Sequence, residues 1–244
     1  MFDALFTTTT EYKKLSHALS GKGACALFGL PASGRAQVYA ALCRQLDKPL
    51  CIVTPGEAEA TRFAADLNTL GIPAAVFPAR DYVLRPIEGT AREYEYRRLA
   101  VLGELVGGRL RAVAVPAEAL TQFTTPKEDF CANTRTLHAG DTLLRDDLLA
   151  ALFGAGYTRR AQVDGPGQFS VRGDIVDIFA PDQKMPVRME FWGDEIDTLH
   201  TFDLTTQRRE DAIDKFYLSP AREVLFGKPA DARQELSDHQ ARPF

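Results

Sequence analysis

Short apolar runs alternate with longer amphipathic segments in the first half of the chain. Four such runs, bounded by glycine, proline or polar residues, predict buried strands at Ala24–Phe28, Leu50–Thr54, Ala74–Phe77 and Ala112–Val115. Strands that are separated by helices pair in parallel through crossover connections. This half therefore predicts an α/β domain built on a parallel sheet.

Helical periodicity fills the intervals between these runs. The predicted helices are Ser33–Gln45, with Ser33 as its N-cap, Glu57–Leu70, Arg92–Val106 and a short one within Pro116–Leu120. Apolar residues recur at helical spacing on the first two, at Val38, Ala41, Leu42 and Leu46 and at Ala60, Phe63, Ala64 and Leu67. The third is expected to expose a solvated charged face with Arg92, Glu93, Glu95, Arg97 and Arg98.

The periodicity changes to two residues in the second half, after a helix predicted over Leu143–Phe153 with Asp141 as its cap. Turn signals follow at Gly165-Pro166-Gly167, Ala180-Pro181-Asp182 and Gly193-Asp194. They divide this region into predicted strands at Phe169–Phe179, Val187–Trp192 and Ile196–Phe202. The pattern is typical of a small α+β module with an antiparallel sheet.

Polar, turn-like residues at 124–129 mark the change between the two patterns. We expect an α/β domain over residues 1–133, an inserted α+β domain over residues 134–216, and a segment over residues 217–244 that begins the return to the α/β domain.

One loop of the first domain has the spacing of a phosphate-binding loop. Residues 29–36 keep the two glycines, Gly29 and Gly34, of the pattern G-x-x-x-x-G-K-[ST]. Arg35 replaces the lysine that reaches the terminal phosphates, and Ala36 replaces the hydroxyl that binds magnesium. This degenerate phosphate-binding loop predicts no ATP hydrolysis, no catalytic residue and no cofactor. Residual nucleotide hydrolysis stays open as the alternative.

Composition narrows the classes of function further. The formal net charge of -4 over 244 residues lacks the basic footprint of a dedicated nucleic-acid module. The four cysteines include no C-x-x-C pair and only four histidines are present, which argues against a metal site. Cys25 and Cys51 lie in apolar runs and are expected as buried, reduced thiols of a cytoplasmic protein. No signal peptide or membrane-spanning run is predicted.

The strand Val187–Trp192 carries the residues that bear most on function. Alternation puts Val187, Met189 and Phe191 on the core side, and Arg188, Glu190 and Trp192 on the opposite side. Tryptophan and arginine are the residue types most enriched at binding hot spots. The competing interpretation is that a neighbouring helix half covers Trp192 and that Arg188 pairs with Glu190.

Arg172 precedes Gly173 in the preceding predicted strand, where a glycine indicates a bulge or a close backbone approach. Arg172 and Arg188 are candidates to lie on nearby strands and point the same way. Asp177 and Glu190 are interpreted as ordinary acidic residues of a strand surface, because nothing in the sequence fixes their separation.

Three segments, at residues 167–179, 186–197 and 202–208, resemble a block shared by the excision-repair helicase UvrB and the bacterial transcription-repair coupling factor Mfd. Phe77–Tyr82 and Arg92–Leu102 resemble first-domain segments of the same family. UvrB has an intact phosphate-binding loop and a long aromatic-rich hairpin, where this chain has the degenerate loop and the short link Val83–Thr90. The chain is therefore most similar in pattern to the N-terminal UvrB-homology region of the coupling factor.

The resemblance implies a RecA/UvrB-like parallel-sheet domain with a degenerate P-loop and an inserted α+β domain that binds UvrA. Carried over residue by residue, the UvrA-contact positions are Arg172, Arg188 and Trp192, the last being phenylalanine in many relatives. The implied role is non-catalytic recruitment of nucleotide excision repair to stalled RNA polymerase.

The resemblance also implies that RNA polymerase and double-stranded DNA are bound, and ATP-dependent translocation is performed, by regions outside this chain. In the full-length factor the UvrA-binding face is expected to be masked until DNA is engaged. The alternatives are a UvrB-like repair helicase fragment with residual ATPase activity and a domain that binds damaged DNA directly.

Overall fold

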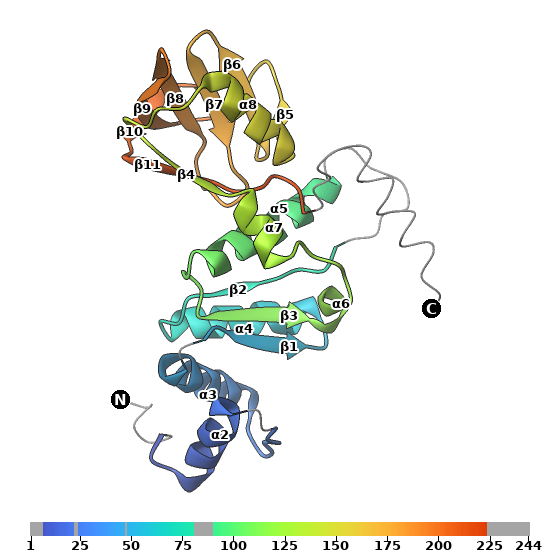
Figure 1. Ribbon diagram of the computed structural model, residues 1–244. Coiled ribbons are helices and arrows are strands. Elements are labelled where there is room, and N and C mark those ends of the chain that lie inside the picture. The colour runs from blue at the N-terminus through green and yellow to red at the C-terminus, as the bar shows by residue number, and fades with distance from the viewer. Residues whose placement is uncertain (1–6, 22–23, 47, 81–89, 224–244) are drawn as a thin grey trace, which may run out of the picture. The chain divides into compact units, whose positions relative to one another are not determined.

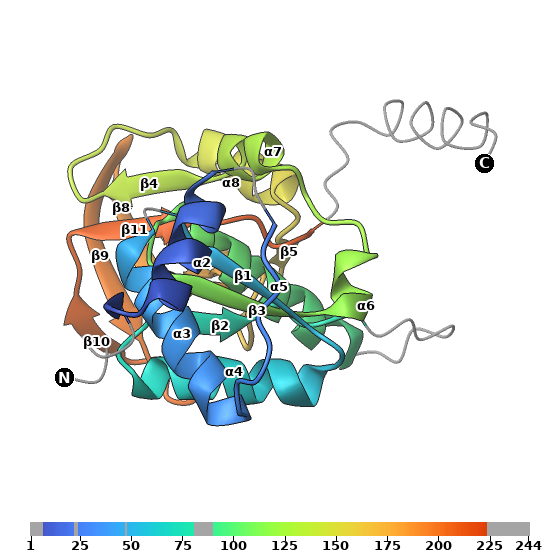
Figure 2. The ribbon, with the colours of Figure 1, turned by 90° about the horizontal axis from the view of Figure 1, so that it is seen from below.

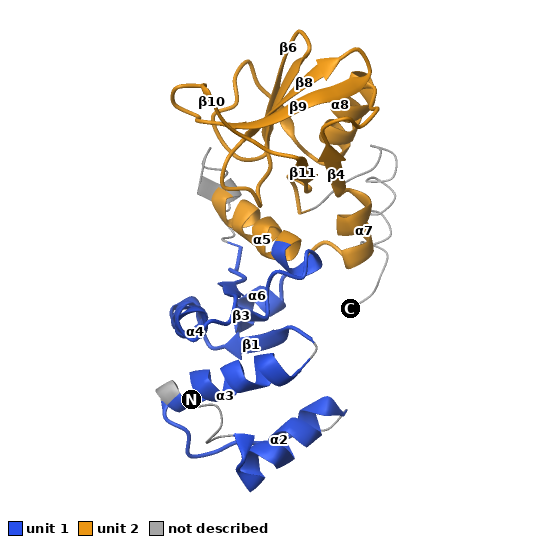
Figure 3. Cartoon of the chain, turned by 90° about the vertical axis from the view of Figure 1, so that its left-hand side faces the viewer, with its two compact units in different colours: residues 1–81, 104–122 blue, residues 82–103, 123–244 orange. Residues whose placement is uncertain are grey.

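The computed structural model describes residues 7–21, 24–46, 48–80 and 90–223 (Figure 1). The chain forms two compact units, one of residues 1–81 and 104–122 and the other of residues 82–103 and 123–244 (Figure 3). The division predicted from the sequence, into residues 1–133, 134–216 and 217–244, stays a prediction.

The first unit is built on a three-stranded parallel sheet in the order β1-β3-β2, with bounds Leu50–Thr54, Ala112–Pro116 and Ala74–Val76. Helix α4, Glu57–Thr69, runs along this sheet (Figure 2). Its buried residues are the four predicted ones, Ala60, Phe63, Ala64 and Leu67. They join Ile52, Ala112 and Ala114 in one apolar core, because a 3.6-residue period puts all four side chains on one face of the helix.

Two further helices, α2 (Thr10–Ser20) and α3 (Ala32–Gln45), pack against each other in this unit. The short α6, Ala117–Leu120, follows β3. Thr9 caps α2 by accepting a hydrogen bond from the backbone N–H of Tyr12 at 3.2 Å. Pro31, not Ser33, is the N-cap residue of α3, so the predicted cap is wrong, although the helix ends at Gln45 as predicted.

The predicted strand Ala24–Phe28 is wrong. These residues pair with no strand in the described part of the chain, and Phe28 is 88% exposed. The expectation of buried thiols is wrong for Cys25 and Cys51, both of which are exposed. A short apolar run predicts that a segment can be buried, but it does not identify a neighbouring strand. A β-strand forms only where such a neighbour pairs with it.

The second unit contains a six-stranded sheet in the order β10-β9-β8-β7-β6-β5. In chain order its strands are β5 (Thr158–Arg159), β6 (Gln168–Arg172), β7 (Ile175–Phe179), β8 (Val187–Trp192), β9 (Glu195–Phe202) and β10 (Arg209–Ala212). Every neighbouring pair is antiparallel except β5 with β6. Together with the parallel sheet of the first unit, this establishes a mixed α/β protein with both kinds of sheet.

Helix α8, Arg145–Gly154, contributes Leu148 and Leu152 to the core of this unit. A two-stranded sheet of β4 (Arg135–His138) and β11 (Lys215–Leu218) adds to the same core. Helix α7 spans Lys127–Ala132, and helix α5 spans Thr90–Val106, of which residues 90–103 belong to this unit.

Two local predictions in this unit are wrong. Phe169–Phe179 is two strands joined by a turn at Gly173 and Asp174, where Gly173 has φ of 61°, and the glycine therefore makes a hairpin and no bulge. Asp141 does not cap α8. Its carboxylate accepts a hydrogen bond from the backbone N–H of His138 at 2.7 Å, and Leu144 is the N-cap residue.

The expected solvated face of α5 is also wrong at one position. Arg98 is fully buried and its guanidinium is paired with the carboxylate of Glu223, with an Nη2–Oε1 distance of 2.8 Å. The two residues are 125 positions apart, so no local charge pattern could reveal the pair.

The link Val83–Thr90, apart from Thr90 itself, and residues 224–244 of the predicted returning segment lie outside the described residues.

Candidate partner-binding surface

The antiparallel register brings one row of polar side chains together across the large sheet. Ser170 on β6 lies opposite Asp177 on β7, Asp177 lies opposite Arg188 on β8, and Arg188 lies opposite His200 on β9. Directly opposed residues project to the same side of a sheet. We call this side the polar face, and it includes Arg172, Ser170, Asp177, Arg188, Glu190, Trp192 and His200.

Asp177 is the centre of the charges on the polar face. It is 1% exposed, and its Oδ1 accepts a hydrogen bond from Arg188 Nε at 2.7 Å. Its Oδ2 accepts from Arg188 Nη2 at 3.0 Å and from Arg172 Nη2 at 2.6 Å. A buried carboxylate needs such charge-assisted bonds to remain ionised, and the two-pronged contact with Arg188 is the strong form of the pair.

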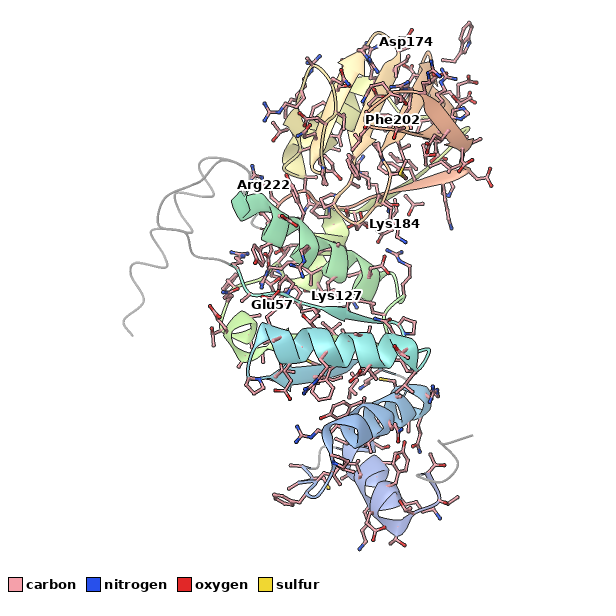
Figure 4. The ribbon with its side chains drawn as sticks, turned by 180° about the vertical axis from the view of Figure 1, so that it is seen from behind. Glu57, Lys127, Asp174, Lys184, Phe202 and Arg222 are labelled. Atoms are coloured by element: carbon pink, nitrogen blue, oxygen red, sulfur yellow. The ribbon has the colours of Figure 1, made fainter. Side chains whose placement is uncertain are left out.

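Arg188 is 8% exposed, and its guanidinium contacts three other residues. Besides Asp177, its Nη1 donates to the backbone carbonyl of Gln207 at 3.1 Å. Its guanidinium lies 4.7 Å from the ring centroid of Phe202, a cation–π contact. Figure 4 places Phe202 inside the second unit, and its ring is fully buried beside Val163 and Phe179.

The turn that carries Gln207 over Arg188 is held by Asp203. The Asp203 carboxylate accepts hydrogen bonds from the backbone N–H of Thr206 at 2.7 Å and from its hydroxyl at 2.8 Å. These two bonds favour the ionised form and lower the pKa of Asp203. Gln207 itself has φ of 59°, a left-handed conformation that non-glycine residues seldom adopt. The turn therefore covers Arg188 with a backbone carbonyl held at a defined position.

A second ion pair lies beside the first on the polar face. Glu190 on β8 is paired with Arg209 on β10, and the Thr198 hydroxyl donates to the same carboxylate at 3.4 Å. The Arg209 side chain is 47% exposed and that of Glu190 is 21% exposed. The sequence-based alternative that Arg188 pairs with Glu190 is thus wrong, because each has another partner.

Trp192 ends β8 on the polar face and is 80% exposed. The outward orientation predicted for it is confirmed, and half-coverage by a helix is wrong in the described structure. The Arg172 side chain is 47% exposed on β6. The polar face thus presents an indole and a half-exposed guanidinium, while Arg188 is buried.

The structure brings Arg172 and Arg188 together through Asp177, and it puts Trp192 four residues from Arg188 along the same strand. Whether these three residues contact a partner stays a prediction. Sequence reasoning missed Asp177 and Arg209. Asp177 could have been found by placing the hairpin turn at Gly173, which fixes the β6–β7 register, whereas Arg209 lies on a strand that was not predicted.

Residues 29–36, which the sequence predicts to be a degenerate phosphate-binding loop, lie in the first unit. Gly29 has φ of 81°, and the Arg35 guanidinium lies 3.8 Å from the Glu59 carboxylate, with both side chains partly exposed. Ala36 is 3% exposed and packs into the core. A pocket of about 370 Å³ is lined by Leu27, Phe28, Gly29, Leu30, Arg35 and Tyr39.

Among the described residues, no helix has the length and apolar character needed to cross a membrane. No group of three or more histidine, cysteine, aspartate or glutamate side chains is placed to bind a metal in that part of the chain.

Residues 136–224, which contain the whole polar face, match the family model of the UvrB interaction domain. This segment is therefore similar to the UvrB interaction domain family. The family expected from the three sequence blocks is thereby confirmed.

Curated relatives extend the similarity beyond the UvrB interaction domain. The chain is 34% identical over 218 residues to the transcription-repair-coupling factor of Myxococcus xanthus, covering 85% of this chain and 18% of that protein. It is 37% identical over 213 residues to the coupling factor of Mycobacterium bovis, covering 83% and 17%. It is 28% identical to UvrABC system protein B of Chlorobium limicola, covering 83% and 32%. The chain therefore spans less than a fifth of the coupling factors that it resembles.

Proposed function

We propose that this chain is a non-catalytic recruitment module of a transcription-repair coupling factor and that its UvrB interaction domain binds UvrA through the polar face. The observation that carries the proposal is the exposure of Trp192 and Arg172 on the polar face of the matched domain. The similarity to both coupling factors and a UvrABC subunit supports a surface that serves excision repair.

The physical basis of the proposed contact is the pairing of an apolar anchor with a cation. The Trp192 indole is 80% exposed and would bury a large apolar area in a pocket of the partner. The entropy cost of ordering this rigid side chain is small. Arg172 adds a charge that steers an acidic partner surface and makes association sensitive to salt. Anchors of this kind dominate interface energetics, and their truncation costs about 2 kcal/mol or more.

Binding of purified UvrA to the 244-residue chain tests the proposal. We expect Trp192→Ala and Arg172→Ala each to weaken binding by about tenfold or more, the magnitude of a hot-spot truncation. Phe28→Ala is the matched control, because Phe28 is an equally exposed aromatic residue in the other unit. Unchanged affinity in both polar-face variants, or absence of UvrA binding by the unmodified chain, would contradict the proposal.

Arg188→Ala is a separate case, since it leaves the buried Asp177 carboxylate without its two-pronged partner. We expect this variant to lose thermal stability as well as UvrA affinity. Its binding defect therefore counts for the interface only when circular dichroism shows a folded chain.

We further propose that RNA polymerase and double-stranded DNA are bound by parts of the coupling factor outside this chain, and that this chain does not turn over ATP. Arg35 faces Glu59 and Ala36 offers no oxygen for magnesium. Magnesium-dependent ATP turnover by the isolated chain, lost on replacing Gly34 with a bulky residue, would instead favour a UvrB-like fragment with residual ATPase activity. Salt-dependent duplex binding would favour direct recognition of damaged DNA.

A further inference from the structure

Asp177 is a buried member of the polar face and is itself inaccessible to a partner. It is 1% exposed, yet both of its oxygens accept hydrogen bonds from arginines on the two flanking strands. Any influence of Asp177 on binding must therefore act through Arg172 and Arg188.

Arg172, Asp177 and Arg188 form a hydrogen-bonded cluster, and Arg172 is the member of the cluster that reaches the surface. Its side chain is 47% exposed, whereas that of Arg188 is 10% exposed. A guanidinium has five N–H donors, and the hydrogen bond from Arg172 to Asp177 uses Nη2. The remaining donors of Arg172 are available to a carboxylate that approaches from solvent.

The charges of the cluster leave one positive charge in excess. Arg172 and Arg188 together carry two positive charges and Asp177 carries one negative charge. The neighbouring Glu190 and Arg209 neutralise each other. The excess positive charge is accessible to a partner at Arg172, because Arg188 is enclosed by Asp177, Gln207 and the ring of Phe202.

We propose that Asp177 is a positioning residue for partner recognition. It fixes the Arg172 guanidinium in the orientation that receives one carboxylate of the partner, beside an apolar hollow that takes Trp192. The inference rests on the proposed function, since it names the chemistry that the same face recognises. A free arginine side chain would lose rotamer freedom on binding, and the bond to Asp177 removes much of that freedom beforehand.

If Asp177 acts only as a counter-charge, removing it should change the affinity for the partner in the opposite direction. If only net charge mattered, removing the Asp177 charge would make the face more positive and tighten its binding to an acidic partner. If Asp177 positions Arg172, removing its charge frees the guanidinium and weakens binding. The direction of the change therefore separates the two roles.

Asp177→Asn in the 244-residue chain makes this measurement, with purified UvrA titrated at low and physiological salt. We expect binding to weaken by about tenfold, a typical coupling for residues in one hydrogen-bonded network. Asp197→Asn is the matched control, because it removes the same charge from an exposed position of β9 in the same sheet. We expect that control to change binding by less than about twofold.

Two Arg172 variants keep the test decisive if Asp177→Asn does not fold. Arg172→Lys keeps the charge but loses the planar guanidinium, so we expect about tenfold weaker binding of UvrA. Because the side chain is half exposed, we expect the fold to tolerate this substitution. In an Arg172→Gln background, Asp177→Asn should produce little further loss. Asp177→Asn binding as tightly as the unmodified chain or more tightly, or Arg172→Lys binding unchanged, would overturn the inference. Failure of the unmodified chain to bind UvrA would instead overturn the proposed function.

Discussion

Tyr157 is a buried polar group that makes the stability of this protein depend on pH. It is 3% exposed and its hydroxyl donates to the backbone carbonyl of Ser219 at 2.7 Å. Burial raises the pKa of the Tyr157 phenol well above its usual range, and the charge of Asp182 adds to the increase. The phenol therefore stays neutral in the folded chain at a pH where an exposed tyrosine ionises.

This raised pKa predicts a loss of stability in alkali. The contribution of Tyr157 is fully present below the unfolded-state pKa of about 10 and is lost as pH rises further, because the unfolded chain releases its proton first. We expect Tyr157→Phe to flatten the decline of the melting temperature above pH 10, at a cost of about 1 kcal/mol at neutral pH from the lost hydrogen bond. Calorimetric scans across pH, with Tyr39→Phe as the control, measure both effects. Identical alkaline slopes in all three proteins would refute the assignment.

At the scale of elements, helix α5 is joined to the segment after β11 by a buried ion pair. Arg98 Nε lies 3.0 and 2.9 Å from the two carboxylate oxygens of Glu223, and both side chains are fully buried. The Glu223 backbone N–H donates to Glu95 at 2.9 Å, and its carbonyl accepts from the Thr125 hydroxyl. Three segments distant in sequence therefore meet at one residue of the second unit.

Breaking this pair should destabilise the second unit strongly. Arg98→Met or Glu223→Leu removes one partner of a buried ion pair, and we expect a loss of about 3–5 kcal/mol in the free energy of unfolding. The double variant Arg98→Met/Glu223→Leu should recover much of that loss, because both buried charges are then removed. Urea titrations followed by far-ultraviolet circular dichroism give the comparison. Additive losses in the double variant would contradict the expected coupling.

The elements show what a sequence pattern can and cannot predict. Helix α4 was predicted to within one residue, because its apolar period and the following Gly71 are both local signals. The hairpin at Gly173 and the burial of Arg98 were missed, since each depends on a partner that local periodicity does not identify. The alternation in β8 sufficed to predict the side on which Arg188 and Trp192 lie. Asp177 needed the cross-strand register as well.

At the scale of the whole molecule, the polar face belongs to one unit of a chain that covers less than a fifth of the coupling factors it resembles. An exposed tryptophan on a sheet face is an apolar area that other parts of such a long protein can cover. In the proposed masking, another part of the coupling factor and UvrA compete for the polar face.

Masking predicts that the 244-residue chain binds UvrA more tightly than the full-length coupling factor does without DNA. We expect at least about a tenfold difference, the effect of a competing state populated at about nine parts in ten. Parallel titrations of UvrA with the two proteins, and with the full-length factor after DNA is added, measure it. Equal affinity of fragment and full-length protein would rule masking out.

Trp192 is the single tryptophan of the chain and is 80% exposed at the end of β8. The intrinsic ultraviolet emission of this indole consequently reports on events at the polar face and hardly at all on the core. Melting of either unit would leave its environment aqueous before and after, so the emission maximum is a poor indicator of unfolding. Enclosure by another molecule would shift that maximum to shorter wavelength and shield it from aqueous quenchers. The protein thus carries its own optical probe at the position where docking is proposed.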